Sequence, residues 1–228
     1  MMTAWAVLVA VEEGVTSLDQ AAGPATVRHL LAHASGFGFD GDKPLMAPGR
    51  RRIYSNTGIE TVAQHVADRA GMPFDEYLRE AVFAPLGMSS SELRGSPAFN
   101  VFSTLDDTNR FVAELMRPTL ITVHTANEAT TVQFPELGGV IPGLGSFAPN
   151  PWGLGIEIRG DKSPHWTGTT NSPRTFGHFG GSGTMTWVDP AVDIALVALT
   201  DRAFDEWSAD ALHLWPEISD AAIAWAKA

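Results

Sequence analysis

The stretch 53-IYSNTGIETVAQHVADRAGMPFDEYLREAVFAPLGM-88 decides how the rest of the sequence is interpreted. Its apolar residues recur at the i, i+3, i+4, i+7 spacing of an amphipathic helix, at Ile59, Val62, Ala63, Val66 and Ala70. Gly71 suits the end of that helix, and Pro73 suits the first turn of a second helix over 73–83. The stretch therefore predicts two consecutive helices with a Tyr-x-Asn triplet, Tyr54 to Asn56, at their entrance.

The segments before this stretch also predict helices. Residues 3–13 are apolar on nearly every face, which is typical of a buried helix, and Gly14 suits its end. Residues 25–36 predict a short helix terminated by Gly36. Residues 37–52 are rich in Gly, Pro and Asp and predict a loop.

One more helix is predicted after the stretch, with a cap at Ser103 or Thr104 and an end at Pro118. Its apolar face is predicted to consist of Leu105, Thr108, Val112, Leu115 and Met116. Residues 119–151 predict a loop-rich segment, because they contain the breakers Gly138–Gly139, Pro142–Gly143 and Pro149–Asn150–Pro151.

The last third of the chain changes to the period of two that marks β-strands. Residues 152–160 and 184–190 alternate, and the continuous apolar run 193–201 predicts a strand buried on both faces. A tight hairpin turn is predicted over 189–193, and a helix over roughly 209–226. Helices followed by antiparallel strands indicate the α+β class.

We therefore expect one domain over 1–228. It has a helical region at about 1–118, a loop-rich part at 119–151, and a sheet with a C-terminal helix at 152–228.

The composition excludes or disfavours several classes of binding partner and site. The net charge of −11, from 15 basic and 26 acidic residues, disfavours nucleic acid as a partner. The absence of cysteine excludes a disulfide or a Cys nucleophile within this sequence. The apolar run near the start is too short to span a bilayer and lacks the features of a signal peptide. We expect a cytoplasmic protein, with any export signal lost with a missing N-terminus.

Two stretches carry residues suited to catalysis. Tyr54 and Asn56 lie two apart, so an extended backbone would point both side chains the same way. In FGHFGGSGT, residues 176–184, His178 lies among glycines just before a predicted strand, where bare N–H groups could face a developing oxyanion. Taken singly, each stretch is more often structural: a turn in the first case and a hydrogen-bonded histidine in the second.

Other site types are disfavoured. His29 and His33 lie four apart on a predicted helix, but no HExxH motif and no third ligand accompany them, so we predict no metal site. The chain also lacks a P-loop and the GxSxG elbow of α/β-hydrolases, and we predict no cofactor.

Three segments together resemble the serine β-lactamase-like superfamily of class C β-lactamases, penicillin-binding DD-peptidases and related esterases. They are TVRHLLAHASGF (26–37), the opening stretch 53–88, and FGHFGGSGTMTWVDP (176–190), in which His-x-Gly stands where the family has Lys-Thr-Gly. The resemblance runs from about residue 3 to about residue 202. It implies a β-lactamase/transpeptidase-like fold: an antiparallel sheet packed by terminal helices, plus a mostly helical subdomain.

The resemblance also implies roles. In the family the Ser of a Ser-x-x-Lys motif attacks an acyl carbonyl, and Tyr54 would act as general base and then general acid. Asn56 would hydrogen-bond the Lys and the substrate, and His178 would line the opposite wall. The Gly181 N–H, on a strand edge, would be an oxyanion donor. Trp152 and Gly180 would bind the substrate, a small ester or amide.

No Ser-x-x-Lys occurs in the sequence. In the family this motif directly precedes the segment that residues 3–19 resemble, so we expect an N-terminally truncated, inactive chain. The same loss is expected to leave the strand at 193–201, or its neighbour, as an open edge. Ser182 is disfavoured as a substitute nucleophile because no base is placed for it; a nucleophile supplied by another chain is a weaker alternative.

The sequence thus favours a serine hydrolase that acts on esters or amides through an acyl-enzyme. An esterase is favoured over a true β-lactamase, because a neutral His178 holds a substrate carboxylate less well than a lysine does. The alternative is a catalytically inactive homologue or a ligand-binding remnant.

Overall fold

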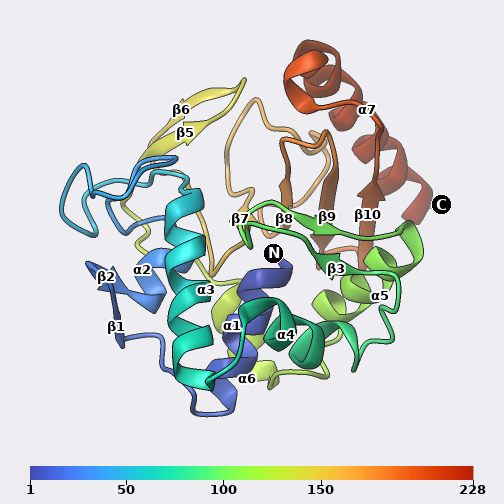
Figure 1. Cartoon of the computed structure of the whole chain (residues 1–228). Coiled ribbons are helices and arrows are strands. Elements are labelled where there is room, and N and C mark those ends of the chain that lie inside the picture. Colours follow the sequence, from blue (N-terminus) through green and yellow to red (C-terminus); the bar gives the residue numbers. More distant parts are fainter. Residues whose placement is uncertain (228) are drawn as a thin grey trace.

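The computed structural model describes residues 1–227 and places a four-stranded antiparallel sheet among helices (Figure 1). The strand order is β10-β9-β8-β7. The strands are β7 (Glu157–Ile158), β8 (Phe176–Phe179), β9 (Met185–Asp189) and β10 (Ile194–Ala198). The predicted α+β class is confirmed.

The helices account for most of the remaining regular structure. They are α1 (Met2–Glu12), α2 (Val27–Leu31), α3 (Asn56–Ala70), α4 (Phe74–Leu78), α5 (Leu105–Met116), α6 (Val123–Ala129) and α7 (Ser208–Ala226). A π-helical turn, Arg79–Phe83, continues α4, and a 3₁₀ turn, Phe204–Glu206, precedes α7. Three small hairpins complete the chain: β1 (Ala21–Ala22) with β2 (Ala25–Thr26), β3 (Glu92–Leu93) with β4 (Val101–Phe102), and β5 (Gly139–Ile141) with β6 (Gly145–Phe147).

The first hydrophobic core lies between α1 and one face of the sheet. Residues 3–10 of α1 are all buried, as expected of a helix that is apolar on every side. Figure 1 shows α1 enclosed by α3 and α4, and Phe176 and Val188 close the core from the sheet. Gly14, with a φ of +73°, follows the end of α1 as predicted.

The second core lies on the opposite face of the sheet, beneath α7. Trp187 and Met185 point to this side of β9, and Phe179 does so from β8. Trp215 of α7 packs among them, and the Trp187 indole N–H donates to Ser219 Oγ at 3.0 Å. Successive side chains of a strand point to opposite faces of the sheet, so each strand contributes side chains to both cores, and the sheet lies between the two cores.

The central helices agree with the sequence prediction. The helix expected from Thr57 is α3; Gly71 adopts φ +70° at its end, and Pro73 precedes α4. Thr104 is the cap of α5 and accepts a hydrogen bond from the Asp107 N–H at 3.2 Å. No helix among residues 1–227 is both long and apolar enough to cross a membrane.

Several predicted boundaries are wrong. The helix expected over 25–36 stops at Leu31, because His33 takes a left-handed φ of +53°; Gly36 lies beyond it in a loop. The segment 119–151 contains α6 and the β5–β6 hairpin. Residues 152–160 form only the short strand β7 and a single bridge between Trp152 and Glu157.

The strand predictions need two further corrections. His178 lies within β8, not before a strand. The apolar strand β10 is half-buried rather than buried on both faces, because in the part that the structure describes it has a strand partner on one side only. In α5, Leu105 is 49% exposed, and Phe111 lies on the buried face instead.

Candidate functional site

The site forms where the entrance to α3 meets strand β8. Tyr54 lies two residues before α3, and His178 shares with Phe176 the face of β8 that points toward α1. The His178 Nε2 and the Tyr54 hydroxyl oxygen are 3.2 Å apart and form a hydrogen bond. Two residues separated by 124 positions in the chain are thereby joined at one point.

Aromatic rings surround the Tyr54 phenol. Trp152 lies 5.9 Å from the Tyr54 ring and 5.6 Å from the His178 ring, with the second pair edge to face. The predicted site residues Tyr54, His178 and Trp152 therefore lie together.

His33 is a member of this site that the sequence prediction missed. Its ring lies 4.4 Å from that of Tyr54 and 4.7 Å from that of Trp152. Its Nδ1 accepts the Ser55 N–H at 3.1 Å, so the neutral ring carries its proton on Nε2. The sequence pairs His33 only with His29, whose ring instead stacks on Phe134 at 4.6 Å.

Burial keeps all three titratable groups uncharged at neutral pH. Burial raises the pKa of Tyr54 to about 12, so its phenol retains its proton. Burial, together with the nearby Met1 amino group, lowers the pKa of His178 to about 4, and the Glu157 carboxylate offsets only part of that shift. Burial also lowers the pKa of His33 well below its usual range. The site therefore holds a neutral phenol and two neutral imidazoles.

Asn56 lies beside the site but turns to different partners. It is the first residue of α3, which Ser55 caps by accepting the Gly58 N–H at 3.0 Å. The Asn56 N–H donates to the Phe39 carbonyl at 2.8 Å, and its side-chain amide donates to Asp40 Oδ1 at 3.1 Å. Within residues 1–227 no hydrogen bond joins Asn56 to Tyr54 or His178.

Gly180 and Gly181 lie just past the end of β8, in its turn toward β9. The Gly180 N–H donates to the Thr184 carbonyl at 2.9 Å, which closes the turn. Gly181 is exposed, and its carbonyl accepts the Phe204 N–H at 2.9 Å. The expected place of Gly181 on a strand edge is therefore wrong, although its own N–H has no protein acceptor within the described residues.

A buried polar network supports the wall formed by Trp152 and His178. Glu157, which pairs with Gly177 in the sheet, accepts hydrogen bonds from Lys162 Nζ at 2.7 Å and from Trp166 at 2.9 Å. His165 Nε2 lies 3.1 Å from the same carboxylate. Burial would raise the pKa of Glu157, but the Lys162 charge and these hydrogen bonds lower it to about 2. The network thus anchors β7 and the loop after it behind the site.

The first turn of α1 approaches the same site, beside the sheet (Figure 1). The Met1 amino group is near enough to lower the pKa of both His33 and His178. One residue into the helix, the Thr3 hydroxyl donates to the Pro97 carbonyl at 2.5 Å. The positive end of α1 therefore points at the imidazoles.

Comparison with known proteins settles the family. The sequence profile named Beta-lactamase matches residues 1–215. This chain belongs to the beta-lactamase family. Among solved structures, it is 53% identical to a beta-lactamase from Mycobacterium bovis, with a TM-score of 0.95, covering 99% of this chain and 84% of that one. The predicted β-lactamase/transpeptidase-like fold is therefore confirmed.

Two more distant proteins also match this beta-lactamase-family chain, one in sequence and one in fold. A protein of Escherichia coli O157:H7 that bears the name "Putative D-alanyl-D-alanine carboxypeptidase" is 24% identical, over 68% of this chain and 46% of that protein. The chain thus spans about half the length of the curated relatives it matches. Simvastatin synthase from Aspergillus terreus shares the fold, with 18% identity and a TM-score of 0.75 over 97% of this chain and 80% of that one.

Proposed function

We propose that this chain belongs to a serine hydrolase that cleaves small esters or amides through an acyl-enzyme. The observation that carries the proposal is the Tyr54–His178 hydrogen bond, walled by Trp152, in a chain of the beta-lactamase family. A proton-carrying phenol beside a neutral imidazole suits a reaction that moves one proton onto a leaving group. The relatives named for β-lactam or peptide substrates act on amides, which is consistent with this reaction class.

The steps follow from acyl transfer. Tyr54 is first deprotonated beside the lysine of a Ser-x-x-Lys, and its phenolate oxygen takes the proton of the nucleophilic hydroxyl as that oxygen bonds to the acyl carbon. The bond from that carbon to the leaving group then breaks. Tyr54 gives its proton to the departing alkoxide or amine. Water repeats the attack on the acyl-enzyme and releases the acid. His178 holds the phenol in place, and the Gly181 N–H stabilises the oxyanion.

Esters are the favoured substrates within this class. At neutral pH His178 is uncharged, whereas the lysine at this place in the family carries a charge that attracts the carboxylate of a β-lactam. Without that charge the affinity for carboxylate-bearing substrates falls, whereas the affinity for an uncharged ester is unaffected. We therefore propose an esterase-type activity rather than a true β-lactamase activity.

The 228 residues contain no Ser-x-x-Lys, so we propose that this chain by itself does not turn over substrate. A Tyr54 with a pKa of about 12 agrees with that proposal, because a protonated phenol is a poor base at neutral pH. The same two observations favour a second candidate: an inactive homologue that binds acyl compounds without cleaving them.

One comparison separates the candidates. The DNA upstream of Met1 is read for an in-frame Ser-x-x-Lys, and the 228-residue protein and an N-terminally extended form are assayed with p-nitrophenyl butyrate and nitrocefin. Turnover of the ester by the extended form only, with nitrocefin cleaved more slowly, supports the esterase. A stop codon upstream, with no turnover of either compound, supports the inactive homologue.

The single domain over 1–228 and the cytoplasmic location are proposals. The proposed partner is a small ester or amide and not nucleic acid.

A further inference from the structure

We propose that Phe39 and Asp40 form a recognition edge beside Tyr54, which selects substrates with an uncharged, apolar group at this point. The proposal rests on the proposed function, since it names the substrate class of the same site. It assigns aryl or alkyl esters and amides to the site and disfavours those that carry a carboxylate.

Phe39 supplies the apolar half of the edge. Its ring stacks on that of Tyr54, with 6.0 Å between centroids and 30° between planes. Its carbonyl is held by the Asn56 N–H at 2.8 Å, so the backbone of this loop residue is tied to the start of α3. Yet 58% of Phe39 is exposed. An apolar ring that stacks beside the half-buried Tyr54 ring but is still open to solvent provides contact area for an apolar ligand.

Asp40 supplies the selective half. Its Oδ1 accepts the Asn56 amide at 3.1 Å, while the residue as a whole is exposed. In the part of the chain that the structure describes, Asp40 forms no ion pair. Its negative charge therefore acts on whatever lies beside Asn56, and a substrate carboxylate there is repelled.

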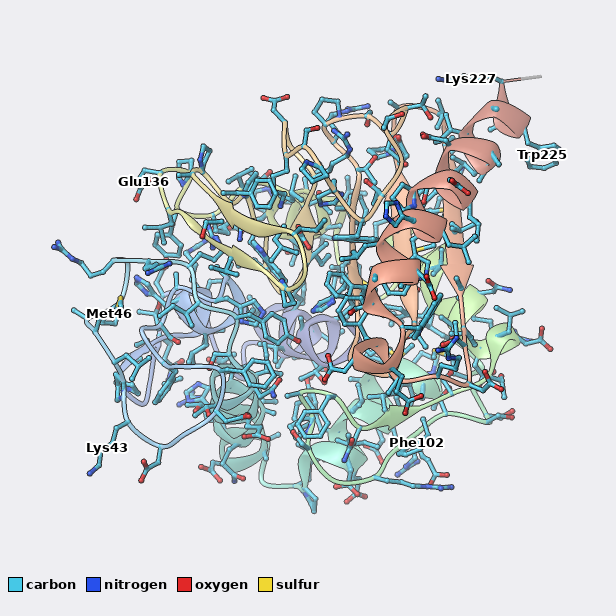
Figure 2. The ribbon with its side chains drawn as sticks, turned by 90° about the horizontal axis from the view of Figure 1, so that it is seen from above. Lys43, Met46, Phe102, Glu136, Trp225 and Lys227 are labelled. Atoms are coloured by element: carbon cyan, nitrogen blue, oxygen red, sulfur yellow. The ribbon has the colours of Figure 1, made fainter. Side chains whose placement is uncertain are left out.

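The loop that carries the edge is closed at its base. The Leu45 N–H donates to the Gly36 carbonyl at 2.8 Å, and Phe37 pairs with Pro44. A Cβ at Gly36, where φ is +88°, would meet the Met46 carbonyl oxygen at 2.1 Å, so this close approach requires glycine. Figure 2 shows Lys43 of the same loop projecting outward from the body of the protein. Phe39 and Asp40 of the loop therefore lie against Tyr54 and Asn56, whereas its Lys43 points away from the body of the protein.

Binding of a matched pair of uncleavable compounds tests the proposal on the 228-residue protein. The pair is N-phenylbutanamide and 4-(butanoylamino)benzoate, which differ by one carboxylate. Binding is followed by the ¹H–¹⁵N signal of the Trp152 indole, assigned with Trp152→Phe. We expect the neutral compound to bind about tenfold more tightly than the benzoate.

Variants assign that difference to the edge. Asp40→Asn keeps an oxygen acceptor for Asn56 and removes the charge, and we expect it to bring the two affinities within about threefold of each other. Asp42→Asn, an exposed carboxylate in the same loop, is the matched control and should leave the ratio unchanged. Phe39→Ala should weaken the neutral compound about tenfold, and Leu45→Ala, at a site that is 70% exposed, should not.

Each result decides one claim. Equal affinities for the two compounds in the wild-type protein, or equal effects of Asp40→Asn and Asp42→Asn, overturn the recognition edge and leave the proposed function standing. If neither compound shifts the Trp152 signal, the acyl site itself is contradicted, and the edge falls with it.

Discussion

Tyr54 and His178 show how burial can dominate the protonation state of a residue. Neither has a charged hydrogen-bond partner, yet the pKa of Tyr54 rises to about 12 and that of His178 falls to about 4. Both shifts favour the uncharged form, because an apolar surrounding penalises charge. The pair is thus a neutral proton carrier that would need an added cation to become a base.

A spectrophotometric titration tests the state of Tyr54 directly. The sequence has only two tyrosines, and burial and the Glu13 carboxylate also raise the pKa of Tyr77, so the folded protein should show almost no tyrosinate absorbance below about pH 11. Tyr77→Phe isolates the Tyr54 signal. An ionisation near pH 10 that persists in Tyr77→Phe and vanishes in Tyr54→Phe would contradict the burial argument.

His178 makes a prediction about stability and pH. Its pKa is about 4 in the folded chain and near 6.5 when unfolded, so between these values the unfolded chain binds a proton that the folded chain does not. The free energy of unfolding should therefore fall with falling pH across this window, by up to about 1.4 kcal/mol per pH unit from this residue. Above about pH 7 the residue should contribute no pH dependence.

The measurement is a series of urea denaturations between pH 7 and pH 4.5. His178→Gln should lose stability less steeply than the wild-type protein, and long-range ¹H–¹⁵N spectra should show the His178 ring neutral down to about pH 5. Parallel stability curves for the two proteins would show that His178 titrates normally.

At the scale of elements, a single carboxylate joins α1, α5 and the segment after α5. Glu114 is 2% exposed and accepts hydrogen bonds from the Trp5 indole at 3.1 Å and from the Thr119 N–H and hydroxyl at 2.8 and 2.7 Å. The Leu120 N–H adds a fourth at 3.0 Å. Both oxygens of a carboxylate can accept these bonds. In a glutamine one oxygen is replaced by an NH₂ group, which cannot accept a hydrogen bond from the donors on that side.

Glu114→Gln should therefore destabilise the protein by about 2–4 kcal/mol, because at least one buried donor loses its acceptor. Glu217→Gln, on the exposed side of α7, is the control and should change stability by less than about 0.5 kcal/mol. Equal melting temperatures for the two variants would show that the four bonds contribute little.

Helix α5 illustrates which features of the helices and strands could be predicted from the sequence. Periodicity and end signals located α1, α3, α5 and α7, because these helices have long apolar faces or clear caps. Periodicity did not reveal that Leu105 is exposed or that Glu114 is buried, since both depend on which neighbour covers the helix. Short strands such as β7 and the pair β5–β6 carry too few residues for a period of two to be visible.

In the candidate site too, residues that belong to a sequence motif could be predicted, and residues that depend on the fold could not. Tyr54, His178 and Trp152 were predicted from motifs and a family resemblance, and the structure brings them together. His33 was missed because its role depends on a left-handed backbone and a hydrogen bond from Ser55, neither of which leaves a pattern in the sequence. The predicted position of Gly181 on a strand edge was wrong, because β8 ends two residues earlier and a run of glycines gives no signal of where a strand ends.

At the scale of the whole molecule, the sheet divides the protein into two packed halves. Trp215 is 1% exposed in the half beneath α7, and Trp225 of the same helix is 78% exposed and projects from its end (Figure 2). Trp215→Ala should cost about 3–5 kcal/mol through the cavity it leaves, and Trp225→Ala less than about 0.5 kcal/mol. Chemical denaturation of both variants checks this, and similar losses would mean that α7 does not seal the second core.

The Tyr54–His178 bond lies on the α1 side of the sheet and links the entrance of α3 to strand β8. A compound seated at this link would contact both elements, and would bind the folded chain but not the unfolded one. Such a compound raises the melting temperature in proportion to the logarithm of its concentration over its dissociation constant. A library of esters and amides could therefore be ranked by thermal shift on this chain, without any measurement of turnover.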